Sequence, residues 1–134
     1  MFRDGILTDN KIKMEENLNK ILMSISYYDN NEFFYHGFMT GLLYYFLNNN
    51  DYIVKSNRGA GDGRYDIMIE RVDRSLGVVI EFKHSDNIDT LEKDALKGLN
   101  QIKDKKYYQD LILDKVETIY TYGISFYKKS CIIK

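Results

Sequence analysis

Proline is absent from the sequence, and cysteine occurs only once, as Cys131. A single cysteine cannot form an intramolecular disulfide, and the first residues lack the long apolar core of a secretory signal. No stretch approaches the roughly 18 uncharged apolar residues that a membrane-spanning helix requires. The sequence therefore predicts a cytoplasmic protein with no membrane segment.

An excess of charge of either sign is also absent, because 19 basic and 20 acidic side chains give a formal net charge of −1. Tight, non-specific binding to nucleic acid usually needs a basic face. A nucleic-acid partner would therefore require the basic residues to gather on one side of the fold. The chain of 134 residues is 44% hydrophobic, which predicts a single folded domain over residues 1–134.

Hydrophobic spacing predicts the order of helices and strands along the chain. The predicted helices cover residues 11–26, 32–49 and 87–112, and the predicted strands cover residues 51–58, 64–72, 76–84 and, as one or two strands, 116–134. The first helix belongs to an N-terminal segment, residues 1–28, that packs on the core. The second is apolar nearly all round and is predicted to be largely buried. The glycine-rich stretch 59–63 is predicted to be a turn.

Three charged residues, Asp66, Glu81 and Lys83, interrupt the two strands that form a predicted hairpin. Side chains alternate between the faces of a strand, so Glu81 and Lys83 share one face. If Asp73 and Arg74 form the loop, Asp66 lies directly opposite Glu81. A loop that differs by two residues leaves the two carboxylates diagonal neighbours, and a loop that differs by one residue separates them.

Two carboxylates at this separation repel each other unless one is protonated or a cation lies between them. Mg²⁺ suits such a site, because it uses one or two carboxylates and fills its other positions with water and substrate phosphate. An ammonium beside it can orient or deprotonate a water, or stabilise charge on a phosphate. The pattern predicts metal-assisted phosphodiester hydrolysis. The alternative is an ion-pair cluster on a solvated sheet face, which the apolar run from Val78 to Phe82 disfavours.

Asp66, then fourteen residues, then Glu81-Phe82-Lys83 resembles the catalytic core of the PD-(D/E)xK nuclease superfamily. The ordered blocks NEFFYHGFMTGLL, SNRGAGDGRYDIMI, GVVIEFKH and GLNQIKDKKYY resemble, more specifically, the nuclease-like C-terminal domain of bacterial AAA-ATPase-like proteins. The resemblance runs from about Leu18 to the end. It implies a restriction-endonuclease-like α/β core, with a central mixed β-sheet flanked by α-helices. Tyr65 stands where the superfamily's name has proline.

The resemblance also assigns roles to residues of the hairpin. Asp66 and Glu81 would be ligands of Mg²⁺ or Mn²⁺, with the backbone carbonyl of Phe82 as a third ligand. Lys83 would be the catalytic lysine. All of these motif residues are intact in this sequence.

Two residues outside the hairpin match the same family pattern. Glu32 matches the helical glutamate, although a carboxylate favoured by the dipole at a helix N-terminus is the simpler interpretation. Gln101 matches the glutamine of the helix after the EFK strand, which implies an active-site or substrate contact. The simpler interpretation of Gln101 is a polar residue on a helix surface.

Three basic residues, Lys55, Arg58 and Arg64, flank the glycine-rich stretch and are candidates for holding a nucleic-acid backbone, although surface cations are usually only solvated. The glycine-rich stretch itself leads into a strand, so it lacks the helix dipole of a nucleotide-binding loop. His36 and His84 are too few, and too unsupported by cysteine, for a zinc site. His36 lies one helical turn after Glu32, which allows the two to share a face, but it is predicted to be a packed or hydrogen-bonded structural histidine.

The sequence thus predicts a Mg²⁺- or Mn²⁺-dependent deoxyribonuclease whose partner is DNA. Because the net charge is close to zero, a homodimer or a partner protein is expected to complete the substrate groove. The competing hypothesis is a catalytically silent nuclease-like scaffold that binds protein or nucleic acid. A nucleotide-driven motor is disfavoured, since no GxxxxGK[ST] loop occurs.

Overall fold

The computed structural model describes residues 1–25, 32–56, 59–60 and 63–134, and for residues 32–33, 59–60 and 63–64 it describes the backbone alone. The helices are α1 (Phe2–Leu7), α2 (Lys11–Met23), α3 (Glu32–Leu47), η1 (Ile88–Thr90, a 3-10 helix), α4 (Leu91–Asp104) and α5 (Gln109–Leu113). The strands are β1 (Tyr52–Ser56), β2 (Gly59–Ala60), β3 (Gly63–Arg64), β4 (Ile67–Arg71), β5 (Leu76–His84), β6 (Thr118–Tyr127) and β7 (Ser130–Ile133).

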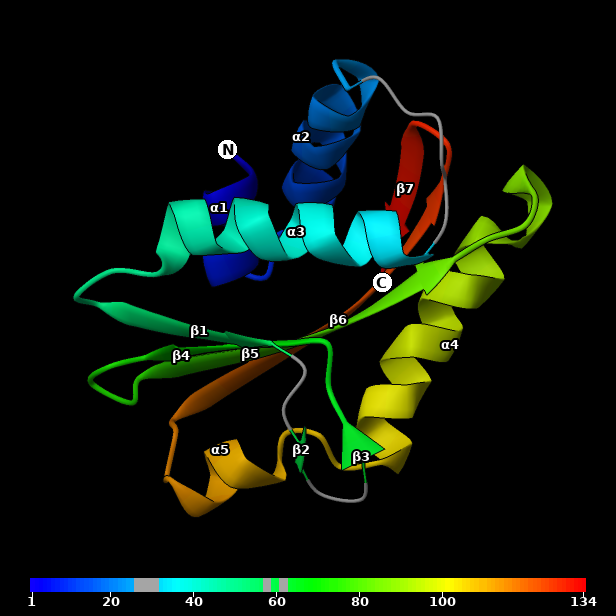
Figure 1. Cartoon of the computed structure of the whole chain (residues 1–134). Helices are drawn as coiled ribbons and strands as arrows, with labels where there is room; N and C mark the ends of the chain where they lie inside the picture. Colours follow the sequence, from blue (N-terminus) through cyan, green and yellow to red (C-terminus); the bar gives the residue numbers. More distant parts are fainter. Residues whose placement is uncertain (26–31, 57–58, 61–62) are drawn as a thin grey trace.

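A five-stranded sheet with the order β1-β4-β5-β6-β7 forms the centre of the molecule. β5 pairs antiparallel with β4 and parallel with β6, so the sheet is mixed. Helices α1, α2 and α3 lie on one side of the sheet, and α4 and α5 lie on the other (Figure 1). Parallel neighbours need a crossover connection, which α4 and α5 provide between β5 and β6. This arrangement confirms the predicted restriction-endonuclease-like α/β fold.

The register of the β4–β5 hairpin agrees with the prediction. Ile67 pairs with Ile80, and the ladder continues through Met68↔Val79 to Glu70↔Gly77. The same register places Asp73 and Arg74 in the turn, where Arg74 has a left-handed φ of 66°. The glycine-rich stretch differs from the prediction, because β2 and β3 pair as a short antiparallel ladder; residues 61–62 lie outside the described part.

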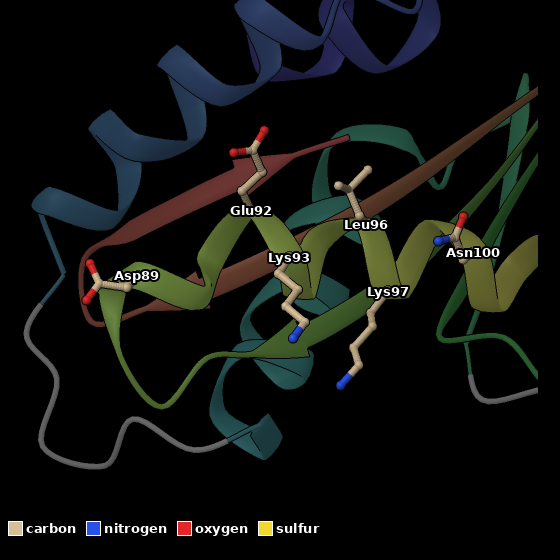
Figure 2. A pocket seen from close by; sticks show the side chains of 6 residues that line it. All are labelled: Asp89, Glu92, Lys93, Leu96, Lys97 and Asn100. Atoms are coloured by element: carbon tan, nitrogen blue, oxygen red, sulfur yellow. The ribbon is translucent and has the colours of Figure 1, made fainter.

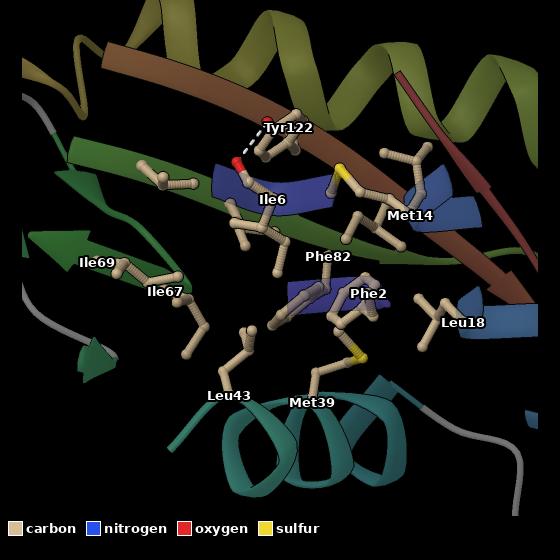
Figure 3. Close-up of a cluster of buried hydrophobic side chains, with 14 of the residues drawn as sticks. Phe2, Ile6, Met14, Leu18, Met39, Leu43, Ile67, Ile69, Phe82 and Tyr122 are labelled. Carbon is tan, nitrogen blue, oxygen red and sulfur yellow. Dashed lines mark hydrogen bonds between the residues drawn. The ribbon is translucent and has the colours of Figure 1, made fainter. Parts of the chain in front are cut away.

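One large apolar cluster joins the sheet to the helices on the α3 side. From α3 it takes Tyr35, Met39, Leu43 and Leu47, which recur every fourth residue and are almost completely buried. Figure 3 shows Met39 and Leu43 pointing into this cluster, toward Ile67 and Phe82. The prediction that α3 is largely buried holds for one face only, because Tyr45 on its outer side is 84% exposed.

Two helices, rather than the one predicted, occupy the described part of residues 1–28. α1 places Phe2 and Ile6 in the core, and the buried hydroxyl of Tyr122 donates a hydrogen bond of 2.9 Å to the Ile6 carbonyl (Figure 3). Gly5 allows α2 to approach, since a Cβ there would lie 2.6 Å from the Met14 side chain. The two helices therefore pack closely against each other, and α1 contributes to the core.

The predicted helix over residues 87–112 is divided into α4 and α5. The break lies at Lys106, whose φ is 53°, and the N–H of Tyr107 donates back to the carbonyl of Ile102 at 3.1 Å. This bond and the left-handed residue are typical of a Schellman-type helix end. The break turns Tyr107 inward to a second apolar cluster, which also contains Met68, Val79 and Leu111.

Side chains cover the backbone at both edges of the sheet. On β7, the N–H of Cys131 donates to Asn19 and that of Ile133 donates to Glu15, both from α2. On β1, the N–H of Val54 donates to the side chain of Asn48. Such cover reduces the tendency of edge strands to pair with other chains. No helix within the described residues is long and apolar enough to cross a membrane.

Candidate active site

Asp66 lies immediately before β4, at the point where the ladder with β5 ends. Its Oδ2 accepts a hydrogen bond of 2.8 Å from the backbone N–H of Phe82. This N–H belongs to the peptide that links Glu81 to Phe82, so the bond holds the Asp66 carboxylate against that peptide. Because the N–H and C=O of a strand residue point to the same side, the Phe82 carbonyl also faces the Asp66 side of β5.

Strict alternation along β4 does not extend to the residues before it. It predicts Tyr65 on the face of Ile67, yet Tyr65 packs with Met68 in the second apolar cluster. The regular strand begins only at Ile67, so the two preceding residues are free to take other directions. The predicted pairing of Asp66 directly opposite Glu81 is not part of the ladder, which ends at Ile67↔Ile80. The position of the Asp66 carboxylate therefore follows from its own contacts rather than from the strand period.

His36 of α3 approaches the same carboxylate from the helical layer above the sheet. Its Nδ1 lies 3.4 Å from Asp66 Oδ1, and the two side chains are 22% and 19% exposed. The His36 ring also packs edge-on against the ring of Phe82, with centroids 5.6 Å apart. The ring contact agrees with the predicted structural role. The approach to Asp66 was not predicted, and its only sequence signal is the spacing of one helical turn between Glu32 and His36.

Glu81 and Lys83 lie on the face of β5 that α4 covers. Glu81 is buried, with 5% exposure, and Lys83 is half-buried. α4 comes close at Gly98, where a Cβ would lie 3.4 Å from the Glu81 carbonyl and 3.5 Å from Cγ of Lys83. The Lys83 ammonium donates a hydrogen bond of 2.6 Å to Gln101 Oε1. The structure thus brings together Lys83 and Gln101, two residues that the sequence singled out separately.

Tyr107 completes this hydrogen-bonded chain. Gln101 Nε2 donates to the Tyr107 hydroxyl at 3.0 Å, and Tyr107 is 3% exposed. One amide therefore accepts from the lysine and donates to the tyrosine, which fixes the orientation of the amide. Sequence reasoning missed this role of Tyr107, because it depends on the helix break that turns the residue inward.

The other predicted residues are placed less completely. Glu32 is the first residue of α3, but its side chain lies outside the described part, as does all of Arg58. Arg64 is placed by its backbone alone, in β3. Lys55 is half-buried in β1, opposite Met68. The rings of His84 and Tyr35 stack, with centroids 5.7 Å apart.

The donor set suits a hard divalent ion by chemical type. Asp66 and Glu81 supply carboxylate oxygens and Phe82 a carbonyl oxygen, which Mg²⁺ and Mn²⁺ accept. Among the side chains that the structure describes, no group of three or more His, Cys, Asp and Glu residues gathers closely enough to hold a metal. Mg²⁺ does not need such a cage, because water and substrate phosphate complete its shell.

Comparison with known proteins gives one result. A family model described as the PD-(D/E)XK nuclease superfamily matches residues 30–134. The matched range includes every candidate site residue from Glu32 to Tyr107. Searches of curated proteins and of solved structures found no match.

Proposed function

Because the chain belongs to the PD-(D/E)XK nuclease superfamily, we propose that it is a metal-dependent nuclease that hydrolyses phosphodiester bonds in DNA. The observation that carries this proposal is the hydrogen bond from the Phe82 N–H to Asp66. This bond lies between Asp66 and the peptide that joins Glu81 to Phe82. Lys83 follows Glu81 by two residues on the same strand.

Asp66, Glu81 and the Phe82 carbonyl would hold Mg²⁺ or Mn²⁺, the ions that suit this oxygen donor set. A bound divalent ion polarises the scissile phosphate and lowers the pKa of a coordinated water. The protein's own contribution is to keep two carboxylates at one end of the β4–β5 ladder. Burial of Glu81 keeps its surroundings poor in water, which strengthens electrostatic interactions there.

Lys83 is the residue that orients the attacking water or stabilises charge on the phosphate. Gln101 holds the ammonium at 2.6 Å and is itself held by Tyr107. Gln101 is therefore a positioning residue in this proposal. Glu32, at the start of α3, belongs to the same proposed site by its match to the family pattern.

The sequence suggests which residues bind the substrate backbone and which partner completes the groove. Lys55, Arg58 and Arg64 bind the nucleic-acid backbone beside the site, and a homodimer or partner protein completes the groove. The four ordered sequence blocks support a closer relationship to the nuclease-like domain of bacterial AAA-ATPase-like proteins. The chain acts as one domain over residues 1–134.

The test is incubation of the purified chain with linear, circular and branched DNA, with and without Mn²⁺. We expect cleavage only with the metal, and loss of cleavage in D66N and in K83M. Both substitutions nearly preserve side-chain volume, and asparagine keeps an acceptor for the Phe82 N–H. Circular dichroism should show that both variants are folded. Equal cleavage by wild type and both variants would refute the assignment.

The second candidate function is a catalytically silent scaffold that binds protein or nucleic acid. It is favoured by the protein contacts of both Asp66 carboxylate oxygens, one with the Phe82 N–H and the other with His36. Titration with Mn²⁺ distinguishes the two functions, because a silent scaffold should neither bind Mn²⁺ nor cleave DNA. Mn²⁺ binding by the wild type that is lost in D66N would support the nuclease function.

A further inference from the structure

α4 has two exposed flanks that differ in charge. Its buried face, which includes Ala95, Gly98 and Ile102, packs on the sheet. Lys93, Lys97 and Gln101 recur every fourth residue and therefore form one row along the helix. Figure 2 shows Lys93 and Lys97 pointing to the same side of α4, while Glu92 points to the opposite side.

The row leads directly to the candidate active site. Gln101 is its last member and accepts the hydrogen bond from the Lys83 ammonium. At about 1.5 Å of rise per residue, successive members are about 6 Å apart along the axis. Two lysines on α4 and the ammonium of Lys83 thus form a cationic track along one flank of the helix.

Two of the three acidic residues of α4 are engaged elsewhere, and the third, Asp104, is exposed at the end of the helix, two turns beyond Lys97 on the same side. Glu92 forms an ion pair of 2.9 Å with Lys134, on the other flank, and Asp94 accepts a hydrogen bond of 2.7 Å from the Ser85 hydroxyl. Among the ion pairs between described residues, none involves Lys93 or Lys97. Both lysines are exposed and border a shallow hollow of about 500 Å³ that Asp89, Glu92, Leu96 and Asn100 also line (Figure 2).

We propose that Lys93 and Lys97 bind the phosphodiester backbone of a nucleic-acid strand and guide it along α4 to Lys83. This inference rests on the proposed nuclease function and adds a binding surface to it. A strand carries one phosphate per roughly 3.4 Å of axis in duplex DNA. The row of about 12 Å from Lys93 to Gln101 therefore spans several consecutive phosphates. Lysine contacts of this kind give affinity without sequence preference.

The experiment measures binding of a fluorescent single-stranded oligodeoxynucleotide by anisotropy, in EDTA so that no cleavage occurs. The variant is K93Q/K97Q, and the control is K103Q. Lys103 lies three helical turns beyond Glu92, on the other flank, beside Tyr108 and Ile112. We expect the double variant to raise Kd roughly tenfold near 0.1 M salt and to lower the slope of log Kd against log salt by about 1.4. K103Q should change neither quantity appreciably.

Unchanged affinity and slope in K93Q/K97Q would overturn the inference, as would no binding by the wild type at low salt. Equal loss in K103Q would also overturn it, because the effect would then be one of net charge. Polyglutamate that competes as well as DNA would identify an acidic protein as the partner instead. Wild-type binding with the expected slope change but no cleavage in Mn²⁺ would support the binding surface and count against the nuclease.

Discussion

The carboxylate of Asp66 accepts a 2.8 Å hydrogen bond from the backbone N–H of Phe82. β4 has no residue in the ladder at this position, since its pairing with β5 ends at Ile67↔Ile80. The carboxylate therefore replaces a strand carbonyl as the acceptor for a peptide in the interior, where the Phe82 residue is 1% exposed. Asp66 has a structural role that is separate from any role in metal binding.

We predict that D66A and D66N differ in stability but not in activity. Alanine leaves the Phe82 N–H without its acceptor, which costs about 1–3 kcal/mol, whereas asparagine keeps an oxygen there. Both remove the charge that a metal needs, so both should abolish cleavage. Urea unfolding followed by circular dichroism measures the difference in stability. Equal free energies of unfolding for the two variants would show that the hydrogen bond contributes nothing.

We expect Y107F to lower kcat about tenfold while leaving the fold intact. The substitution removes only the hydroxyl that receives the Gln101 amide, so Gln101 can rotate and Lys83 loses its fixed partner. Supporting residues of this kind typically contribute 10- to 100-fold. The measurement is kcat and KM on DNA with Mn²⁺. Y108F is the control, because Tyr108 is the adjacent tyrosine and has no hydrogen bond to Gln101 within the described residues. A kcat equal to that of the wild type would show that Gln101 needs no support.

We predict that H36A weakens Mn²⁺ binding about tenfold. His36 lies 3.4 Å from Asp66 Oδ1, and its loss frees the carboxylate to rotate, as happens when a residue that supports a metal ligand is removed. H36N should keep part of the affinity, since its amide can donate from a similar place. Isothermal titration calorimetry measures the affinity. Identical Mn²⁺ affinities in wild type and H36A would confine His36 to its packing contact with Phe82.

The sequence was sufficient to predict the hairpin that carries the motif, because a period of two and a short polar loop leave few registers. The register with Asp73 and Arg74 in the loop is the one observed. The mixed sheet was predicted from the resemblance to the nuclease superfamily. The residues that Asp66 and Gln101 contact could not be predicted from the sequence. The contact of Asp66 with His36 depends on how α3 crosses the sheet, and that of Gln101 with Tyr107 depends on a bend at Lys106.

That bend shows why the helix boundary was missed. Helices usually end at glycine or asparagine in the left-handed region, but here Lys106 takes this conformation with φ of 53°. Lysine is a good helix former, so the local sequence predicts continuation. The sequence also failed to predict α1, because its local pattern is weak. Phe2 and Ile6 supply too few apolar residues for a helical period, and the helix is stabilised by packing against Tyr122.

Gly123 of β6 sets the distance between the sheet and α4. A Cβ at this position would overlap the backbone of α4 at the Ala95 carbonyl and the Leu99 nitrogen. We predict that G123A destabilises the protein by about 3 kcal/mol, at the upper end for overpacking, because backbone atoms cannot move aside as side chains can. It should also lower kcat, since α4 carries Gln101. Chemical denaturation measures the first effect.

G41A is the matched control for G123A, because Gly41 lies in α3 with no atom within 4 Å of an added Cβ. Alanine is favoured over glycine in a helix by about 1 kcal/mol, so G41A should be neutral or stabilising. Similar losses of stability in the two variants would show that the close approach of α4 is not the cause.

Cys131 is buried in β7, with 3% exposure. Burial raises the pKa of its thiol, and the nearby Glu15 carboxylate adds to the shift. Because the thiolate is the reactive form, the folded protein should hold an inert thiol at neutral and mildly alkaline pH. We predict that Ellman's reagent modifies Cys131 only after unfolding in urea. A raised pKa leaves less of the reactive thiolate at every pH below it. Modification of the native protein as fast as that of the unfolded chain would show that β7 detaches from α2, despite the hydrogen bonds that its backbone N–H groups donate to Asn19 and Glu15.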